Sequence, residues 1–337
     1  MEAFLYEKLD DNKVRCNLCS HQCIIKDGRK GICGVRENKS GILETLVYNK
    51  VIARHIDPIE KKPLFHVSPG SLSYSIATVG CNLKCRFCQN ADIAQFPTEN
   101  RVSIPGKNCT PEDIVEDAFR ANCRTIAYTY TEPTVYFELA LETAKLAQKK
   151  GLKNVFVTNG FMTREAIQMI APFLDAANVD LKAFSDDFYK TLCSARIEPV
   201  KEALMDMKSL GIFVEVTTLL IPGLNDSPDE IDQLASFIAN SLGTETPWHI
   251  SRFHPTYRLT DRPPTPVQTI IDARQRGFKA GLKYVYTGNV PGEEGESTFC
   301  YACKKCLIDR YGFQVKKNLI KNSKCPFCDA LIDGIEL

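Results

Sequence analysis

The sequence lacks three features that would indicate a secreted, membrane-spanning or duplex-binding protein. Its first residues, MEAFLYEKLDDNKVRC, show no basic region followed by an apolar stretch, so we expect no signal peptide. No run approaches the roughly 18 consecutive apolar residues that a transmembrane helix needs. The 42 basic and 41 acidic residues give a net charge of +1, which argues against a duplex-binding surface. We expect a cytoplasmic protein that binds neither membrane nor nucleic acid.

Cysteine is the residue type in marked excess, with 15 in 337 residues. In a long chain without a secretion signal, closely spaced cysteines indicate metal or cluster ligands rather than a disulfide framework. Twelve fall into three groups: Cys16, Cys19, Cys23 and Cys33; Cys81, Cys85 and Cys88; Cys300, Cys303, Cys306, Cys325 and Cys328. Three stand alone, and we expect them to be small buried hydrophobic side chains: Cys109, Cys123 and Cys193.

The region between the second and third groups alternates short apolar runs with helical segments. The runs are rich in Val, Ile, Thr and aromatic residues, which is typical of strands buried on both faces of a parallel sheet. We predict strands at 72–79, 124–130, 153–159, 176–182, 212–221, 248–253 and 282–288. This alternation predicts βαβ units, and therefore a barrel or an open doubly wound sheet. We place this core at residues 72–290, between an N-terminal lobe (1–71) and a C-terminal lobe (291–337).

Three predicted helices begin with a recognisable start signal: TPED at 110–113, SPDE at 227–230 and TPVQ at 265–268. In each, Ser or Thr can cap the helix and Pro takes the first helical position. The acidic or Gln residue three places on from the cap completes a capping box.

Polar signatures follow six of the predicted strands. The first strand leads into GCNLKCRFC, and the later ones lead into TEPT, TNG, DLK, IPGLND and FHP. In α/β barrels and doubly wound sheets the working residues lie at the C-terminal ends of the strands. We therefore expect these segments to converge on one active site.

The stretch CNLKCRFC offers three thiolates, at spacings of three and then two residues. Three thiolates can hold zinc together with a fourth ligand from elsewhere in the chain. They can also hold three irons of a [4Fe–4S] cluster and leave the fourth iron without a protein ligand. The second arrangement keeps a coordination position open, as catalytic zinc sites do.

CNLKCRFCQN resembles the signature of radical S-adenosylmethionine (radical SAM) enzymes, whose fold is a partial (β/α)6 TIM-like barrel. The resemblance implies that Cys81, Cys85 and Cys88 hold a [4Fe–4S] cluster whose open iron binds S-adenosylmethionine. One electron then cleaves S-adenosylmethionine, and the resulting 5′-deoxyadenosyl radical abstracts hydrogen from a protein or small-molecule substrate. The resemblance also implies an electron donor of the flavodoxin or ferredoxin type.

Two further motifs match the family at the second and third strands. Glu132 in YTYTEPT stands at the Gly-Gly-Glu position that holds the amino group of S-adenosylmethionine. Thr158 and Asn159 belong to a segment, TNG, that matches the third strand of the family. The resemblance therefore implies that these three residues bind S-adenosylmethionine.

The later strands match the glycyl-radical-enzyme activases within the family. Asp180 and Lys182 correspond to their Asp-x-Lys motif, and His254 corresponds to a histidine near the ribose. LIPGLND at 220–226 corresponds to the segment that passes the adenine. The resemblance implies cofactor-binding roles for Asp180, Lys182 and His254.

A narrower resemblance covers essentially the whole chain. RCNLCSHQC, GICGVREN, VIARHIDPIEKKPLFHVSPG and GLKYVYTGNVPGEEGESTFC are similar to the AmmeMemoRadiSam group, which is encoded alongside Memo-like and Ammecr-like proteins. That group is similar to pyruvate formate-lyase activating enzymes. Two departures count against a plain activase role. Tyr130 and Thr131 replace the Gly-Gly pair, and Val157 replaces an Asp that helps to bind a cation beside S-adenosylmethionine.

The flanking groups have four or more cysteines each, and we interpret them as closed metal sites, in which protein ligands fill every coordination position. CYAC and CPFC, with Cys300, Cys303, Cys325 and Cys328, have nearly the spacing of a zinc ribbon, and we favour zinc over a second cluster. Cys306 we expect to be a spare thiol. Cys16, Cys19, Cys23 and Cys33 suit either zinc, which we favour, or an auxiliary [4Fe–4S] cluster.

Two alternatives compete with a radical SAM enzyme of unidentified substrate. The first is a glycyl-radical-enzyme activase of the pyruvate formate-lyase type. The second is a multi-zinc binding or adaptor protein. This hypothesis does not explain the motifs TEPT, TNG and DLK. Metal content separates the second alternative from an iron–sulfur enzyme.

Overall fold

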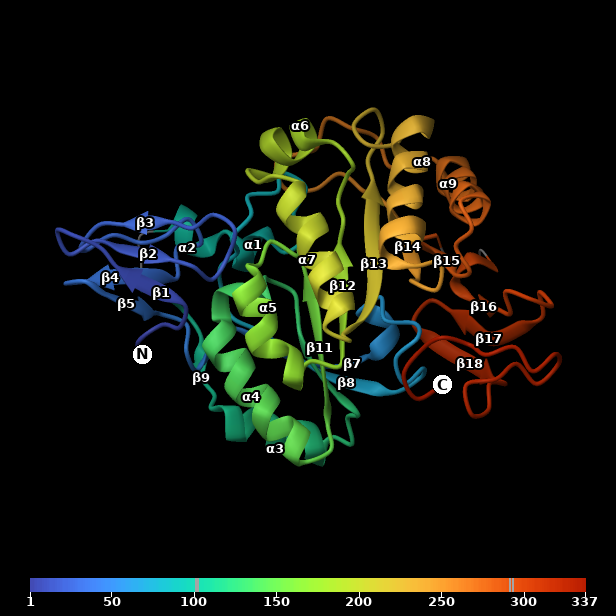
Figure 1. The fold of residues 1–337 in the computed structure, drawn as a ribbon, viewed down its shortest axis with the longest axis horizontal. Helices are drawn as coiled ribbons and strands as arrows, with labels where there is room; N and C mark the ends of the chain where they lie inside the picture. The colour runs from blue at the N-terminus through green and yellow to red at the C-terminus, as the bar shows by residue number, and fades with distance from the viewer. Residues whose placement is uncertain (101–102, 291, 293) are drawn as a thin grey trace.

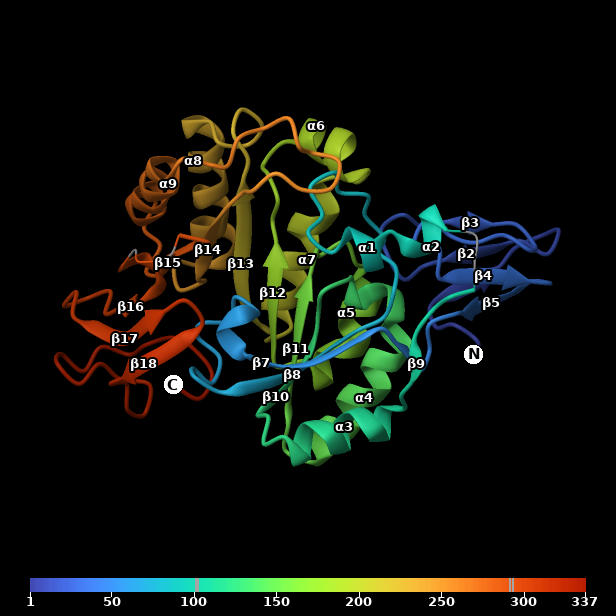
Figure 2. The same ribbon diagram turned by 180° about the vertical axis from the view of Figure 1, so that it is seen from behind.

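The structure is a computed structural model that describes residues 1–100, 103–290, 292 and 294–337. Its centre is one large sheet covered by helices, with a small lobe at each end of the long dimension (Figures 1 and 2). None of the helices in these described segments is long and apolar enough to cross a membrane.

The central sheet has eight strands in the order β15-β14-β13-β12-β11-β10-β8-β7. Seven of them run parallel, each beside its neighbour in the chain: β8 (Leu72–Ala77), β10 (Thr125–Tyr128), β11 (Lys153–Thr158), β12 (Ala176–Asp180), β13 (Phe213–Leu220), β14 (Trp248–Arg252) and β15 (Val285–Gly288). These are the seven predicted strands, so that prediction is confirmed. Their order never reverses, as it would in a doubly wound sheet, so the sheet is a partial α/β barrel.

Six helices connect the parallel strands and cover one face of the sheet (Figures 1 and 2). They are α3 (Pro111–Arg120), α4 (Phe137–Lys149), α5 (Arg164–Ile170), α7 (Glu198–Ser209), α8 (Pro228–Phe237) and α9 (Val267–Lys279). Three shorter helices lie at the strand ends: α1 (Ala91–Ala94), α2 (Phe96–Glu99) and α6 (Asp186–Phe188).

Two of the three predicted helix starts carry the expected cap. Thr110 and Asp113 exchange bonds between side chain and backbone at the start of α3, which is a full capping box. Ser227 caps α8 by accepting from the backbone N–H of Glu230 at 3.3 Å. The Glu230 carboxylate does not close the box, because it accepts from the backbone N–H of Phe184 at 2.8 Å. Glu230 thus ties α8 to the loop after β12.

The predicted cap at Thr265 is wrong. Helix α9 begins at Val267, after Pro266, and has no side-chain cap. The buried Thr265 hydroxyl donates to the carbonyl oxygen of Leu220 at 2.6 Å and accepts from the N–H of Phe253 at 3.0 Å. Those bonds tie the ends of β13 and β14 together, so the hydroxyl is not available to the helix.

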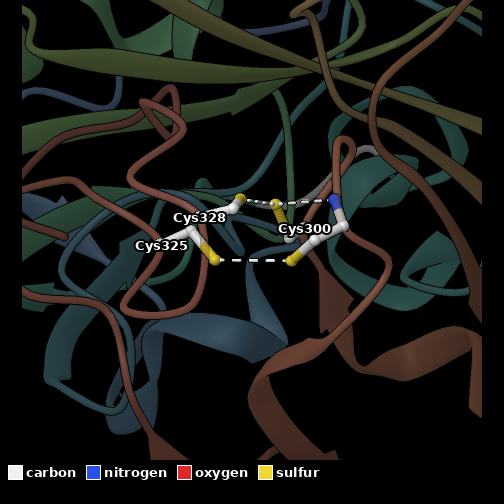
Figure 3. A group of neighbouring side chains, drawn as sticks. Cys300, Cys325 and Cys328 are labelled. Atoms are coloured by element: carbon white, nitrogen blue, oxygen red, sulfur yellow. Dashed lines mark hydrogen bonds between the residues drawn. The ribbon is translucent and has the colours of Figure 1, made fainter.

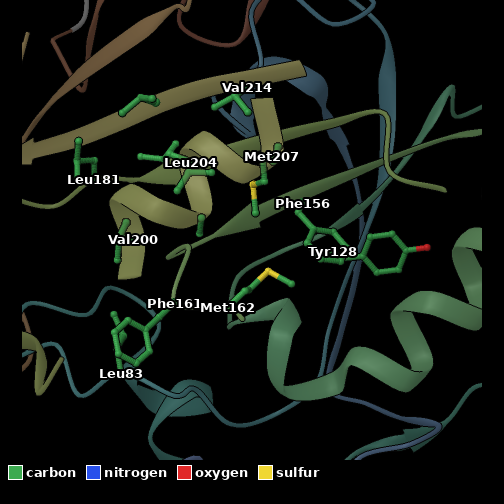
Figure 4. Close-up of a cluster of buried hydrophobic side chains, with 14 of the residues drawn as sticks. Leu83, Tyr128, Phe156, Phe161, Met162, Leu181, Val200, Leu204, Met207 and Val214 are labelled. Carbon is green, nitrogen blue, oxygen red and sulfur yellow. The ribbon is translucent and has the colours of Figure 1, made fainter. Parts of the chain in front are cut away.

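The main core lies between the sheet and the helices. Phe156 of β11 and Val214 of β13 pack in a buried cluster with Leu204 and Met207 of α7 (Figure 4). The opposite face of the strands is also buried, by a cluster that combines Ile59, Leu64 and Val67 with Ala127, Val155 and Ala176. Burial on both faces explains why these strands are apolar nearly throughout.

The N-terminal lobe is built from short antiparallel strands: β1 (Tyr6–Lys8), β2 (Val14–Cys16), β3 (Ile24–Ile25), β4 (Arg36–Lys39) and β5 (Ile42–Thr45). Next come β6 (Lys50–Val51), which pairs with β9 (Lys107–Asn108), and β7 (Ala53–Pro58), which pairs antiparallel with β8. Thus β7 extends the central sheet although it precedes the predicted boundary at residue 72. The C-terminal lobe is a three-stranded antiparallel sheet of β16 (Thr298–Phe299), β17 (Cys306–Tyr311) and β18 (Gln314–Asn318).

Candidate active site and its flanking cysteine groups

The C-terminal ends of the parallel strands surround a cavity of about 560 Å³. Eight of the nine residues predicted to bind a cluster or S-adenosylmethionine line it: Cys81, Cys85, Cys88, Glu132, Thr158, Asn159, Asp180 and Lys182. The ninth, His254, has an exposed side chain and is not among the described residues that line this cavity. Strand ends that are far apart in the sequence therefore meet at one place, as the barrel topology requires.

The cysteine loop leaves β8 through Gly80, which has a φ of 105°. A Cβ at this position would lie 2.8 Å from Val35 Cγ1 and 3.3 Å from the carbonyl oxygen of Cys33. Only glycine combines this backbone conformation with such a close approach. The glycine therefore lets the cysteine loop pack directly against the N-terminal lobe.

Asn159 and Asn82 lock the cysteine loop to the end of β11. The side-chain amide of Asn159 donates to Asn82 Oδ1 at 2.8 Å and lies 3.7 Å from Cys81 Sγ. Its Oδ1 accepts from the N–H of Phe161 at 2.9 Å, and Asn82 Nδ2 donates to the carbonyl oxygen of Phe161 at 3.1 Å. The TNG segment thus positions the first cysteine ligand.

The Glu132 carboxylate is buried at the wall of the cavity and held by a dense set of hydrogen bonds. Oε1 accepts from the N–H and hydroxyl of Thr134, at 3.0 and 2.6 Å, and from the Thr158 hydroxyl at 2.7 Å. Oε2 accepts from the N–H of Asn159 at 2.8 Å. Burial raises the pKa of Glu132, although these hydrogen bonds oppose the rise. The result is a fixed acceptor that a bound cation can use.

Asp180 and Lys182, at the end of β12, form an ion pair in the lining of the same cavity, with Lys182 Nζ 2.8 Å from Asp180 Oδ2. Burial lowers the pKa of Lys182, but Asp180 and Cys85 outweigh it and hold the pKa well above its usual range. Val157 lines the cavity as well. The position of the activase Asp is therefore apolar, and the Asp180 carboxylate already has a cationic partner.

Tyr130 is a site residue whose role the sequence did not reveal. Its φ of 62° lies in the left-handed region, which explains why glycine suits this position in the Gly-Gly-Glu pattern. The conformation is held by Asn90 Nδ2, which donates to the Tyr130 carbonyl oxygen at 2.7 Å, and by a hydrogen bond from the Tyr130 hydroxyl to Asp57. The Nζ atom of Lys62 lies over the Tyr130 ring, 4.5 Å from the ring centroid. The same atom is 2.6 Å from Asp57 Oδ2. The only sequence feature that could have pointed to Tyr130 was its place in the motif, where the family has Gly.

Cys193 is a second residue that sequence reasoning undervalued. It is buried, as expected of all three isolated cysteines, and its thiol hydrogen-bonds to the Cys85 thiol. Two backbone hydrogen bonds hold the two segments together. The N–H of Lys84 donates to the carbonyl oxygen of Cys193 at 2.8 Å, and the N–H of Arg86 donates to the carbonyl oxygen of Leu192 at 2.9 Å. The hydrogen bond from Cys193 is the main cause that lowers the pKa of Cys85. Nothing in the sequence pairs these two cysteines.

The four predicted C-terminal ligands meet in a compact group (Figure 3). The sulfurs of Cys300, Cys303, Cys325 and Cys328 all lie within 4.8 Å of one another, and two of the pairs are 3.6 and 3.7 Å apart. Four thiolates around a tetrahedral zinc ion, with Zn–S bonds of about 2.3 Å, are about 3.8 Å apart. Cys306 lies at the start of β17, outside this group. The group therefore has the dimensions of a single-ion site.

The four N-terminal cysteines also meet, but less closely. Cys16, Cys19, Cys23 and Cys33 line one small cavity of about 20 Å³ in the N-terminal lobe. Over the residues that the structure describes, the C-terminal four are the only set of three or more possible ligands gathered within 4.8 Å. The N-terminal four, like the three cysteines of the central cavity, are therefore more widely spaced than ligands of one ion.

Comparisons with known proteins agree with this geometry. The profile of the radical SAM superfamily matches residues 75–238, which span β8 to α8. An uncharacterized protein of Methanocaldococcus jannaschii is 50% identical over 334 residues, 98% of each chain. The pyruvate formate-lyase-activating enzyme of Clostridium pasteurianum is 24% identical over 172 residues, 49% of this chain and 69% of that one. The structure of a radical SAM methyltransferase from Sphaerobacter thermophilus superimposes with a TM-score of 0.52 and 19% identity, over 68% of this chain and 70% of that one.

Proposed function

Because the chain belongs to the radical SAM superfamily, we propose that its central cavity binds a [4Fe–4S] cluster and S-adenosylmethionine and starts a radical reaction on a substrate. The observation that carries the proposal is the convergence of Cys81, Cys85 and Cys88 with polar residues from the ends of β10, β11 and β12 on one cavity of about 560 Å³. When bound, the cluster supplies one electron that cleaves S-adenosylmethionine to methionine and a 5′-deoxyadenosyl radical, which takes a hydrogen atom from the substrate.

The three cysteines fit such a cluster better than a single ion. All three cysteines line the cavity, yet within the described part of the chain their sulfurs do not form a group within 4.8 Å, as those of the C-terminal four do. In a cluster each thiolate binds its own iron, so the sulfurs stand farther apart than around one ion. Burial raises the pKa of Cys88 to about 11, so ligand binding must displace a proton there.

The polar residues of the cavity have the chemistry to hold S-adenosylmethionine. Glu132 offers a buried, pre-oriented carboxylate for the amino group. The Lys182 ammonium, paired with Asp180, offers a second charged group at the C-terminal end of β12. Because these groups are held by protein hydrogen bonds before any ligand arrives, little reorganisation is needed on binding.

Anaerobic reconstitution with iron and sulfide tests the proposal. After reduction with dithionite, the protein should convert S-adenosylmethionine to 5′-deoxyadenosine and methionine, measured by liquid chromatography. Cys85→Ala should lose both the cluster absorbance and the cleavage. Cys123→Ala, which removes a buried cysteine outside the three groups, is the matched control and should keep both. A wild-type protein that holds a cluster but leaves S-adenosylmethionine intact would refute the proposal.

We propose further that the chain is a cytoplasmic member of the AmmeMemoRadiSam group and takes its electron from a flavodoxin or ferredoxin. Memo-like and Ammecr-like proteins are the partners that this grouping implies. The motifs along the whole chain support the grouping. Pull-down with each partner class under anaerobic conditions tests it, and the absence of any complex or any effect on S-adenosylmethionine turnover would count against it.

A glycyl-radical activase is the second candidate, because the chain is similar to the pyruvate formate-lyase-activating enzyme of Clostridium pasteurianum. Two features count against it: Val157 at the position of the activase Asp, and Asp180 engaged with Lys182. A glycyl-radical signal in a candidate partner, recorded by electron paramagnetic resonance after incubation with the reduced protein, would favour this role.

For the C-terminal lobe we propose a structural zinc ion on Cys300, Cys303, Cys325 and Cys328. The match between the observed sulfur distances and those of a tetrahedral Zn–S₄ site supports it. Elemental analysis should find about one zinc per chain at this site.

A further inference from the structure

A segment between β7 and β8, residues 59–67, forms the floor of the central cavity. Asn178 Nδ2 of β12 donates to the carbonyl oxygen of Pro63 at 2.7 Å, and the Glu215 carboxylate of β13 accepts from the backbone N–H of Phe65 at 3.1 Å. Asn178 and Glu215 each precede, by two positions, a residue that lines the cavity, and residues two apart in a strand share a face. The floor segment therefore lies inside the barrel, one layer of side chains below the strand ends.

Lys61 and Lys62 of the floor segment both line the cavity, and they share one carboxylate. Lys61 Nζ lies 2.8 Å from Asp57 Oδ1, and Lys62 Nζ lies 2.6 Å from Asp57 Oδ2. The Tyr130 hydroxyl donates to the same carboxylate. Two ammonium groups that share one carboxylate leave the floor of the cavity with one positive charge in excess.

The ammonium group of Lys62 is buried, with only 1% of the residue exposed. Burial lowers the pKa of Lys62 to about 8, although Asp57 opposes the fall. An ammonium group has three N–H donors, and Lys62 directs one to Asp57 and one, at 3.5 Å, to the Tyr130 hydroxyl. Among the described residues no further acceptor binds Lys62 Nζ. An anion in the cavity would take the remaining donor and offset the cost of burying the charge.

A second observation in the same cavity points to a polar ligand. Thr217 of β13 lines the cavity, and its hydroxyl has no hydrogen-bond partner among the described residues, although the residue is only 8% exposed. Ser251 of β14 and Asn289, which follows β15, line the cavity as well. None of these three residues is predicted to bind the cluster or S-adenosylmethionine. Because buried polar groups are normally paired, this wall suits a second, polar molecule.

We infer that the substrate of the central cavity carries an anionic group, a carboxylate or a phosphate, which binds Lys61 and Lys62. The inference rests on the proposed function, because it names the chemical class of the molecule on which the radical acts. The floor segment lies below the strand ends that we assign to S-adenosylmethionine. An anion bound there therefore holds the substrate with its remaining part directed toward those strand ends.

Equilibrium dialysis with labelled inorganic phosphate and with labelled malonate tests the inference. The reconstituted protein is first saturated with S-adenosylmethionine, so that neither probe can occupy that site. We expect at least one probe to bind at a single site per chain, and Lys61→Met and Lys62→Met should each lose most of that binding. Preference for phosphate indicates a phosphorylated substrate, and preference for malonate indicates a carboxylate. A wild type that binds neither probe, or variants that bind as well as the wild type, would overturn the inference.

Lys283→Met is the matched control, because Lys283 has similar surroundings outside the central cavity. Its Nζ lies 3.1 Å from Asp333 Oδ2 and 4.7 Å from the centroid of the Tyr301 ring. The control should bind the probe as the wild type does. Loss of binding in the control would mean that the probe does not report on the floor of the central cavity, and the inference would fail.

Asp57→Asn keeps the test decisive if the lysine variants do not fold. It removes the carboxylate that competes for both ammonium groups, so it should bind the probe several-fold more tightly than the wild type. Equal or weaker binding would contradict the inference. Dialysis needs no turnover, so the result is separate from the cleavage assay. A protein that binds the probe but leaves S-adenosylmethionine intact fails only the proposed function, and one that cleaves it but binds no probe fails only this inference.

Discussion

Each end of the chain carries four cysteines that meet in space, but the two lobes hold them differently. The C-terminal sulfurs all lie within 4.8 Å of one another, as the ligands of a single metal ion do. The hydrophobic cluster that contains two of these cysteines has only nine buried residues. The N-terminal sulfurs surround a cavity, and Cys16 belongs to the main core of the barrel. We therefore expect the C-terminal lobe to depend on the proposed zinc ion for stability, because a small lobe buries little apolar surface. The N-terminal lobe is stabilised largely by its contacts with the barrel.

The largest expected effect comes from breaking the C-terminal site. Cys300→Ala should release zinc and unfold β16–β18, because binding of zinc contributes roughly 10–16 kcal/mol to small zinc domains. Hydrogen exchange should show loss of protection in these strands, while β8 and β10–β14 stay protected.

Cys306→Ala is the matched control in the same lobe, because Cys306 lies outside the four-sulfur group. It should keep both the zinc and the protection. Release of zinc from this control would mean that the ligand set differs from the one described.

The next largest effect should come from the contact that holds the N-terminal lobe on the barrel. Arg36 Nη2 donates to the buried carboxylate of Glu138 on α4. Arg36→Met should lower the free energy of unfolding by about 3–5 kcal/mol, because it leaves Glu138 buried without its partner charge. Urea denaturation of the reconstituted protein measures the change.

The double variant Arg36→Met/Glu138→Leu should recover much of that loss, since it removes both charges. If the single and double variants were equally unstable, the effect would come from altered packing and not from the unpaired carboxylate.

A smaller effect is expected at the wall between the N-terminal and central sites. Asn159→Ala should weaken iron retention in the central site by roughly 10- to 100-fold, the usual loss when a residue that supports a metal ligand is removed. The reason is that Asn159 holds Asn82 and contacts Cys81. Iron release to a chelator, followed by absorbance, measures it.

Any zinc on the C-terminal cysteines should be released from Asn159→Ala as slowly as from the wild type, because those four cysteines are untouched. Equal acceleration at both sites would show that the substitution destabilises the whole protein rather than the first cysteine of the central loop.

The smallest expected effect concerns the contact between Cys193 and Cys85. A hydrogen bond to a ligand sulfur stabilises the more negative, reduced state of a cluster. Cys193→Ala removes this bond from Cys85. The reduction potential of the central site should fall by roughly 40 mV, the one-electron equivalent of about 1 kcal/mol. Spectroelectrochemical titration measures it.

Cys193→Ser, which keeps a donor, should restore most of the lost potential. An unchanged potential in Cys193→Ala would show that the Cys193 thiol does not stabilise the reduced central site.

Much of the fold could be predicted because its signals are local. Each of the seven parallel strands is an apolar run of β-branched and aromatic residues, and each lies where the sequence predicts it. The cap at Thr110 was predictable for the same reason. The cap at Thr265 was not, because its hydroxyl bonds to β13 and β14 through contacts that only the folded chain creates.

The candidate site was predictable to the extent that its residues lie at strand ends. Glu132, Asn159 and Lys182 were found because a barrel brings strand ends together. Asp57 and Cys193 were not found, because β7 joins the sheet from the predicted N-terminal lobe and Cys193 comes from the turn after α6. His254 follows β14 in the sequence, yet its side chain is exposed outside the cavity.

The sequence by itself determined the order of strands, the three cysteine groups and the polar residues at the strand ends, since these depend on neighbouring residues. Only the tertiary structure decided the distances between sulfurs. The cysteine spacing in the sequence does not set these distances. The N-terminal sulfurs are farther apart than the C-terminal ones because the strands of the N-terminal lobe place them around a cavity. The tertiary structure also brought Cys193 to Cys85 and set the N-terminal group against the central one, because packing joins segments that the sequence keeps apart.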